Sequence, residues 1–183
     1  GFILQGDRKR GLQLCGFNDT RPTILVVGGG TGAMRLNEIV WDALPELTKK
    51  YQVIHVTGQG KGPPLNLPLV KGENEGVTRY RAFDFVTSEI ADLYAAADLV
   101  ITRAGMGVLT ELATLKMPMM IVPIPESHQE DNARYFEKRK AAVVLDQRKL
   151  SVKQLSVTIE RLLRDLGDTQ EMTERAYELS GSD

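Results

Sequence analysis

Three short stretches of this 183-residue chain carry residue types that could bind a phosphate or a sugar. They are the loop Gly28-Gly29-Gly30-Thr31-Gly32-Ala33, the turn Gly105-Met106-Gly107, and the polar run from Ser127 to Asn132. Each follows an apolar, strand-like run and opens a helix-like segment. Backbone N–H groups at such a turn, with the positive end of a helix dipole behind them, attract an anion. The pattern predicts a phosphate-bearing ligand, and the alternative is a tight turn that needs glycine and binds nothing.

The first glycine loop matches no complete nucleotide motif. It satisfies the G-x-G-x-x-A dinucleotide fingerprint, which also needs an acidic residue about 20 positions on to bind a ribose. Here the second strand-like run, QVIHVTGQG, reaches Thr57 and Gly58 without an acid. A P-loop would carry Lys and then Ser or Thr after its last glycine, where this chain has Met34 and Arg35. Glycine content alone therefore does not identify the ligand.

The other two stretches offer side chains suited to a sugar nucleotide. Glu111 lies in the first turns of its helix-like segment, where a carboxylate can accept hydrogen bonds from both hydroxyls of a ribose. The alternative is that Glu111 complements the helix dipole. With Ser127 as N-cap, Gln129 and Asn132 share a helix face. Their amides donate and accept at once, which suits the hydroxyls of a hexose, whereas capping and solvation are the alternative.

Strand-like and helix-like segments alternate through most of the chain. Continuous Val, Ile and Leu runs are typical of parallel strands that are covered on both faces. They predict a doubly wound, Rossmann-like α/β fold with a parallel sheet of about six strands, whose ligands bind beyond the carboxyl ends of the strands. The expected strands are TILVVGG, QVIHVTG, VTRYRAF, DLVITRA, MMIVPI and AVVLD, and the expected helices are 34–50, 89–97, 107–116, 129–141, 152–166 and 169–180.

Local signals refine these boundaries. The sequences SHQE at 127–130 and SVKQ at 151–154 fit capping boxes. Pro45 predicts a break or restart in the first long helix. Residues 1–21 are expected to be a connecting segment, and residues 58–76, rich in Gly, Pro and Asn, a long surface loop.

Composition excludes several classes of protein and site. A net charge of −1 with scattered Lys and Arg argues against binding of nucleic acid. Cys15 is the single cysteine, which excludes an internal disulfide. The apolar run MPMMIVPI is far shorter than the roughly 20 residues of a transmembrane helix. We see no Asp-x-Asp pair and no Cys/His ligand set, so no metal and no cofactor are expected.

The combined motifs resemble the MurG-like glycosyltransferases, family 28 of the GT-B type, in their donor-binding C-terminal half. The resemblance is carried by GGGTGA, then AADLVITRAG with TELA and K-P, then IVPIPESHQEDNA with FEKRKAAVVLD, and it runs roughly from residue 22 to 180. It implies a connecting segment at 1–21, a nucleotide-sugar-binding domain at 22–183, and an absent N-terminal acceptor domain. It also implies an inverting transfer of N-acetylglucosamine from UDP-N-acetylglucosamine to a lipid-linked acceptor (lipid I to lipid II, in peptidoglycan synthesis).

The resemblance assigns roles to individual residues. The turn that meets the diphosphate and sugar contains Gly30 and Thr31, and the uracil pocket is lined by Val86. The second phosphate and nucleoside loop is formed by Arg103, Gly105, Met106, Gly107 and Val108. The ribose diol is bound by Glu111, and the sugar is read by His128, Gln129 and Asn132.

The catalytic base is expected in the absent half, so this chain alone should bind the sugar donor without transferring it. His55 lies within a strand and is expected in the core, and His128 is expected to cap the helix or contact the sugar. Gln5 stands where the family has an arginine near the diphosphate, which leaves Arg8 or Arg103 to supply that charge. The resemblance implies a protein that is cytoplasmic or lies at the cytoplasmic face of the plasma membrane (the bacterial inner membrane), with peripheral membrane contact only in the full-length protein.

Other functions stay open. Within the same class, galactolipid synthases and the donor subunit of dolichol-linked N-acetylglucosamine transfer share the motifs less closely. UDP-N-acetylglucosamine 2-epimerases share the architecture but need acidic and basic catalytic groups across the cleft. A nucleotide-sugar-binding module without chemistry is the remaining alternative. Sugar transfer after the missing half is added back would separate a transferase from a module.

Overall fold

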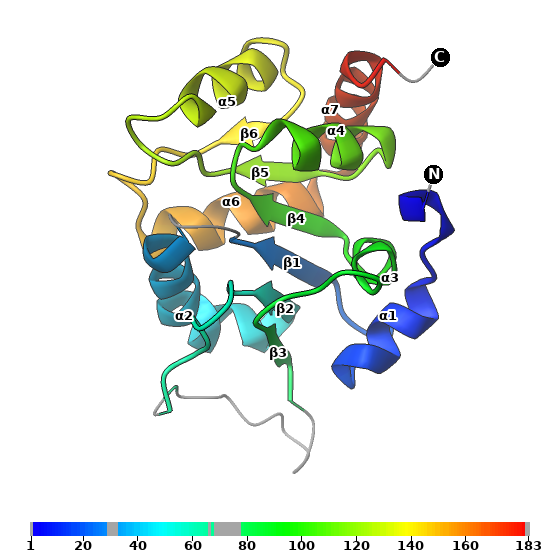
Figure 1. The fold of residues 1–183 in the computed structure, drawn as a ribbon, viewed down its shortest axis with the longest axis vertical. Helices are drawn as coiled ribbons and strands as arrows, with labels where there is room; N and C mark the ends of the chain where they lie inside the picture. The colour runs from blue at the N-terminus through cyan, green and yellow to red at the C-terminus, as the bar shows by residue number, and fades with distance from the viewer. Residues whose placement is uncertain (1, 29–32, 66, 68–77, 182–183) are drawn as a thin grey trace. The chain divides into compact units, whose positions relative to one another are not determined.

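Strands and helices alternate along the chain in the computed structural model, which describes residues 2–28, 33–65, 67 and 78–181 (Figure 1). The chain divides into two compact units, Gly1–Asp98 and Leu99–Asp183.

The first unit contains three parallel strands. β1 pairs with β2 and β2 pairs with β3, so their order is β3-β2-β1. β2 is buried along its whole length, as its continuous apolar sequence predicts. Figure 1 shows α2 on one face of these strands and α1 with α3 on the other. The elements are η1 (Phe2–Gln5, a 3₁₀ helix), α1 (Arg8–Cys15), β1 (Thr23–Val27), α2 (Ala33–Lys50), β2 (Gln52–Val56), β3 (Tyr80–Phe83) and α3 (Ile90–Ala96).

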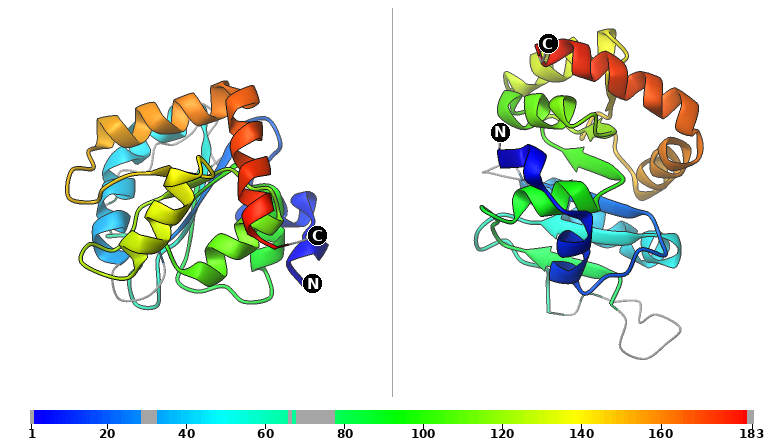
Figure 2. Two further views of the ribbon diagram at one scale, coloured as in Figure 1. Left: turned by 90° about the horizontal axis from the view of Figure 1, so that it is seen from above. Right: turned by 90° about the vertical axis from the view of Figure 1, so that its right-hand side faces the viewer.

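The second unit adds three more parallel strands in the order β4-β5-β6. β4 and β5 are fully buried, α6 packs on β4, and α4 packs on α7. Figure 2 shows that the chain turns sharply between α6 and α7. The elements are β4 (Leu99–Thr102), α4 (Met106–Thr114), β5 (Met119–Ile121), α5 (Gln129–Lys138), β6 (Val143–Val144), α6 (Val152–Arg164) and α7 (Leu166–Leu179). All six predicted strands and all six predicted helices are present, which confirms the α/β fold class.

Two local predictions about helices were wrong. Pro45 lies inside a continuous α2, because residues on both sides of it, such as Trp41 and Leu47, are buried and hold the helix in place despite the missing N–H. The predicted capping box at 127–130 does not form, and the N-cap of α5 is His128 rather than Ser127. The hydroxyl of Ser127 accepts the N–H of Gln129 at 3.2 Å and not that of Glu130, and the carboxylate of Glu130 binds Arg148.

The second predicted N-cap is confirmed. Ser151 precedes α6 with an extended backbone, and its hydroxyl accepts the N–H of Gln154 at 3.1 Å.

Helix α1 has no counterpart among the predicted elements. It packs against α3, and two glycines allow the close approach. A Cβ atom on Gly6 would collide with the carbonyl oxygen of Ala91, and one on Gly11 would collide with that of Asp92. The expected connecting segment therefore contains a helix that is packed into the first unit. That residues 1–21 also join a further domain remains a proposal.

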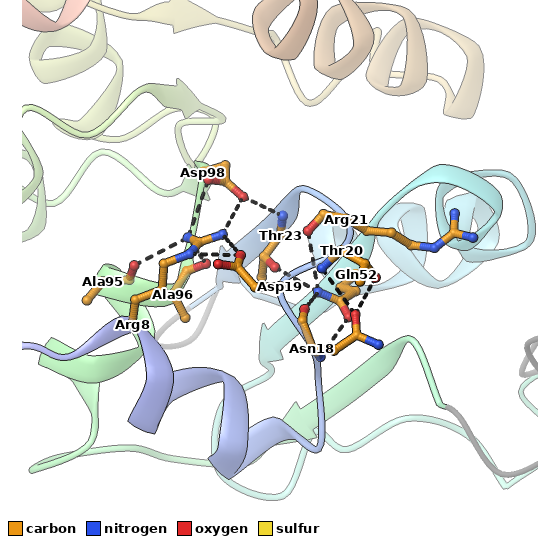
Figure 3. A network of polar contacts seen from close by, with 10 residues as sticks. All are labelled: Arg8, Asn18, Asp19, Thr20, Arg21, Thr23, Gln52, Ala95, Ala96 and Asp98. Atoms are coloured by element: carbon orange, nitrogen blue, oxygen red, sulfur yellow. Dashed lines mark hydrogen bonds and ion pairs between the residues drawn. The ribbon is translucent and has the colours of Figure 1, made fainter.

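Arg8 ties the start of α1 to the end of α3 (Figure 3). Its guanidinium donates to the carbonyl of Ala96 at 2.8 Å and to the carboxylates of Asp19 at 2.7 Å and Asp98 at 3.4 Å. Asp98 also accepts the N–H of Thr23, the first residue of β1, at 2.7 Å. An arginine at a helix C-terminus satisfies carbonyls and complements the dipole. Because this guanidinium is already engaged, the expectation that Arg8 could serve a diphosphate is not supported.

Candidate functional site

The second glycine turn connects β4 to α4 and presents the start of that helix. Gly105 is the N-cap, with φ −70° and ψ 128°, and has no side chain to accept the first-turn N–H groups. The first turn of α4 carries no acidic residue, so no carboxylate within that turn offsets the positive end of the helix. Such N–H groups need a partner from outside the helix, which is either water or an anion.

Within the described residues, the glycines of this turn are not required by packing. A Cβ atom added to Gly105 or Gly107 would meet no atom of those residues within 4 Å. Gly107 lies inside α4, where glycine destabilises a helix by up to about 1 kcal/mol relative to alanine. At Gly28 an added Cβ would instead lie 3.0 Å from Oδ1 of Asn37. The glycines of the second turn thus leave its backbone without side-chain cover and lower the stability of α4. This favours a bound ligand over a tight turn that binds nothing.

Gln129 and Asn132, from the first turn of α5, both hold Ala104 in this turn. Oε1 of Gln129 accepts the N–H groups of Ala104 at 3.1 Å and Ile124 at 3.2 Å. Nδ2 of Asn132 donates to the carbonyl of Ala104 at 2.9 Å. Both side chains are half-buried. The sequence predicts the shared face of these two residues but gives no sign that they bind Ala104.

Arg103 directly follows β4 and is buried. The residue is 5% exposed, and its Nη1 donates to the carbonyl of Val122, directly after β5, at 3.0 Å. Burial lowers the pKa of Arg103 to about 10, so the guanidinium stays charged at neutral pH. The side chain of Arg103, two positions before Gly105, thus joins the end of β4 to the residue that follows β5.

The remaining predicted site residues are partly accessible. Met106 is 46% exposed, and Val108 and Glu111 are half-buried on α4. His128 is exposed and lies at the N-cap position of α5, where its side chain makes no capping hydrogen bond within the described residues. Val86 is half-buried in the first unit, just after β3. Gly30 and Thr31 lie outside the described residues, so their predicted roles are not addressed by the geometry.

A buried hydrogen-bond network joins α2 to β2 and β3. Nε2 of His55 contacts Oδ1 of Asn37 at 2.8 Å, Nδ1 contacts the hydroxyl of Tyr80 at 3.1 Å, and Nε1 of Trp41 donates to that hydroxyl at 3.0 Å. Asn37 also donates to the carbonyl of Thr57 at 2.9 Å. Because Asn37 uses Oδ1 as the acceptor, Nε2 of His55 carries the proton and Nδ1 accepts from Tyr80. His55 is therefore a core residue, as expected, and the network around it was not foreseen.

Burial lowers the pKa of His55 to about 3 and raises the pKa of Tyr80 to about 12, so both are neutral around pH 7. Within the described ranges, no three His, Cys, Asp or Glu side chains gather as metal ligands would. None of the helices in that part of the chain is long and apolar enough to cross a bilayer.

Comparison with known proteins places this geometry in a family. Residues 23–182 match the Glycosyltransferase family 28 C-terminal domain. The UDP-N-acetylglucosamine–N-acetylmuramyl-(pentapeptide) pyrophosphoryl-undecaprenol N-acetylglucosamine transferase 2 of Bacillus cereus is 39% identical over 164 residues, which are 87% of this chain and 44% of the relative. The corresponding transferase of Legionella pneumophila is 39% identical over 166 residues, covering 88% of this chain and 44% of the relative.

Solved structures agree in fold. The crystal structure of Acinetobacter baumannii MurG superposes with a TM-score of 0.71 and 27% identity, covering 93% of this chain and 48% of that one. WaaG, a glycosyltransferase involved in lipopolysaccharide biosynthesis, has a TM-score of 0.67 at 19% identity over 96% of this chain and 47% of that one, a likeness of fold alone. The chain thus spans slightly less than half the length of these proteins. It belongs to the glycosyltransferase family 28 C-terminal domain family and has the fold of one half of a GT-B glycosyltransferase.

Proposed function

We propose that this chain is the donor-binding domain of an inverting glycosyltransferase that transfers N-acetylglucosamine from UDP-N-acetylglucosamine to a lipid-linked acceptor. The printed names of the curated relatives support this donor and a pyrophosphoryl-undecaprenol acceptor. The chain covers 44% of those relatives. We therefore assign it one part of the activity, the binding of the sugar donor. Binding of the acceptor and the catalytic base are assigned to sequence outside it. Action at the cytoplasmic face of the membrane, by peripheral contact of the full-length protein, is part of the proposal.

The observation that carries the proposal is the uncovered start of α4. No packing contact among the described residues requires its glycines, and N–H groups in the first turn of a helix favour an anion such as a diphosphate. In the transfer, the acceptor hydroxyl attacks the anomeric carbon as the bond from that carbon to the phosphate oxygen breaks, and the hydroxyl proton passes to the base that we assign to sequence outside this chain. UDP leaves with the bonding electrons, and the helix start with the charge of Arg103 stabilises the negative charge that develops.

Three side chains supply the remaining contacts in this proposal. Glu111, in the second turn of α4, accepts hydrogen bonds from the ribose diol. Gln129 and Asn132 use one end of each amide to hold Ala104. Nε2 of Gln129 and Oδ1 of Asn132 make no hydrogen bond to the described part of the chain, so a donor and an acceptor are left for sugar hydroxyls.

Calorimetric titration with UDP, UDP-N-acetylglucosamine, UDP-galactose and NAD tests the proposal. We expect binding of the uridine ligands, a preference for the N-acetylglucosamine donor and little binding of NAD. Glu111→Ala should weaken binding by roughly 1.5–3 kcal/mol, because hydrogen bonds to a charged group are lost.

Two glycine variants provide a matched pair for the same titration. Gly107 and Gly167 are each the second residue of a helix, and an added Cβ meets no atom of the described residues within 4 Å at either position. Both Gly→Ala variants should therefore fold at least as stably as the wild type. Only Gly107→Ala should weaken UDP binding. Equal UDP affinity in the two variants, or tight binding of NAD by the wild type, would contradict the proposed site.

A further inference from the structure

We infer that Gln129 and Asn132 are positioning residues for the nucleotide-binding turn as well as contacts for the sugar. The inference rests on the proposed function, which supplies the ligand. Its structural basis is that both amides reach the same peptide unit, one at the N–H of Ala104 and the other at its carbonyl. Ala104 directly precedes Gly105, the N-cap of α4. The placement of the first turn of α4 is thus set by side chains that come 25 and 28 residues later in the chain.

The backbone around Ala104 is held mainly by these side chains. The strand pairing of β4 ends where Val122 donates to the carbonyl of Thr102 at 2.8 Å. The helical hydrogen bonds of α4 begin where Leu109 donates to the carbonyl of Gly105 at 3.1 Å. Between these two anchors, Ala104 is fully buried, and its N–H and carbonyl are both paired with α5. A buried peptide group without such partners is unfavourable, so the turn depends on the two amides.

Gln129 also holds a second segment of the backbone. Its Oε1 also accepts the N–H of Ile124 at 3.2 Å, so a single oxygen joins the segment that follows β5 to the turn that follows β4. A sugar that bonds to Nε2 of Gln129 and Oδ1 of Asn132 would fix both amide planes. It would thereby steady the N–H groups that face the diphosphate. Sugar and diphosphate recognition are coupled in this arrangement, because the same amide planes serve both.

The discriminating measurement is the affinity for UDP, which has no sugar. Gln129→Met keeps the length of the side chain without its oxygen, and Asn132→Leu keeps the shape without the N–H. Neither variant changes the charge. If the amides only contacted sugar, UDP would bind both variants as it binds the wild type. We expect UDP to bind each variant roughly 10-fold more weakly, since displacement of the turn misplaces the N–H groups. Asp131→Asn is the control on the same helix turn. The Asp131 carboxylate is exposed and, among the described residues, pairs with Arg134, so this change should leave UDP affinity unchanged.

Amide hydrogen exchange in the ligand-free protein tests the hydrogen bonds to Gln129 independently of any ligand. The N–H groups of Ala104 and Ile124 should exchange at least about 10-fold faster in Gln129→Met than in the wild type, because their acceptor is gone. Gln129→Glu, whose carboxylate can accept the same two bonds, should retain the protection. Unchanged exchange in Gln129→Met, or unchanged UDP affinity in both apolar variants, would overturn the inference. Failure of the wild type to bind UDP, with the exchange pattern intact, would instead contradict the proposed function.

Discussion

At the scale of single residues, the fold determines the charge of His55. The ring is fully buried on β2 and hydrogen-bonded through both nitrogens, so a proton added to it would lose solvation and meet a donor, the hydroxyl of Tyr80. Burial lowers its pKa from 6.5 to about 3. In the unfolded chain His55 titrates near 6.5, so between these two pH values the unfolded state binds a proton that the folded state does not. The stabilising contribution is complete above pH 6.5 and is lost progressively as the pH falls towards 3.

The direction of this pH dependence of stability gives a measurable prediction. The free energy of unfolding of the wild type should fall below pH 6.5 by up to about 1.4 kcal/mol per pH unit from His55 alone. Carboxylates also titrate in acid, so the measurement is the difference between the wild type and His55→Gln in chemical denaturation from pH 8 to pH 4.5. The stability advantage of the wild type at pH 8 should shrink as the pH falls. An advantage that stays constant across this range would show that the ring takes up its proton in the folded state.

Residue types alone identified most of the candidate site but not how its members are held. Glu111 follows from its residue type and position, since a carboxylate in the first turns of a helix can accept from a ribose diol. The shared face of Gln129 and Asn132 follows from spacing, because helical periodicity places three-apart residues on one face. The attachment of both amides to Ala104 does not, since it depends on how the segments after β4 and β5 meet α5. The network around His55 likewise joins α2, β2 and β3, whose meeting is a property of the fold.

At the scale of elements, the parallel strands were predictable because buried strands need unbroken apolar runs. Helix α1 was not. Its sequence, RKRGLQLC, is largely polar and has a glycine in its middle, a combination that usually argues against a helix. The glycine is explained only by α3, whose carbonyl of Asp92 lies where the Cβ of any other residue would be. The low helix propensity of this segment is thus overcome by its packing against α3, about eighty positions away in the chain.

The packing of α1 can be tested through Cys15. Burial raises the pKa of this thiol to about 12, so little thiolate is available for alkylation while α1 stays on α3. Gly11→Ala should force the helices apart, destabilise the first unit by roughly 1–3 kcal/mol and speed alkylation of Cys15 in native buffer. Gln13→Ala changes an exposed residue of the same helix and should leave the rate unchanged. Equal alkylation rates in the two variants would mean that α1 does not depend on the glycine contact.

At the scale of the whole molecule, the proposed function links ligand binding to stability. A ligand that binds only the folded chain stabilises it by about 2.7 kcal/mol at a concentration 100 times its dissociation constant. For a chain of this size, that corresponds to a rise in Tm of roughly 5–11 °C. UDP at that concentration should produce this rise, and NAD should not. Since the proposed site holds the diphosphate by N–H groups and positive charge, EDTA should leave the rise unchanged, and Gly107→Ala should remove most of it. A rise that EDTA abolishes would mean that a metal ion holds the diphosphate instead of the start of α4.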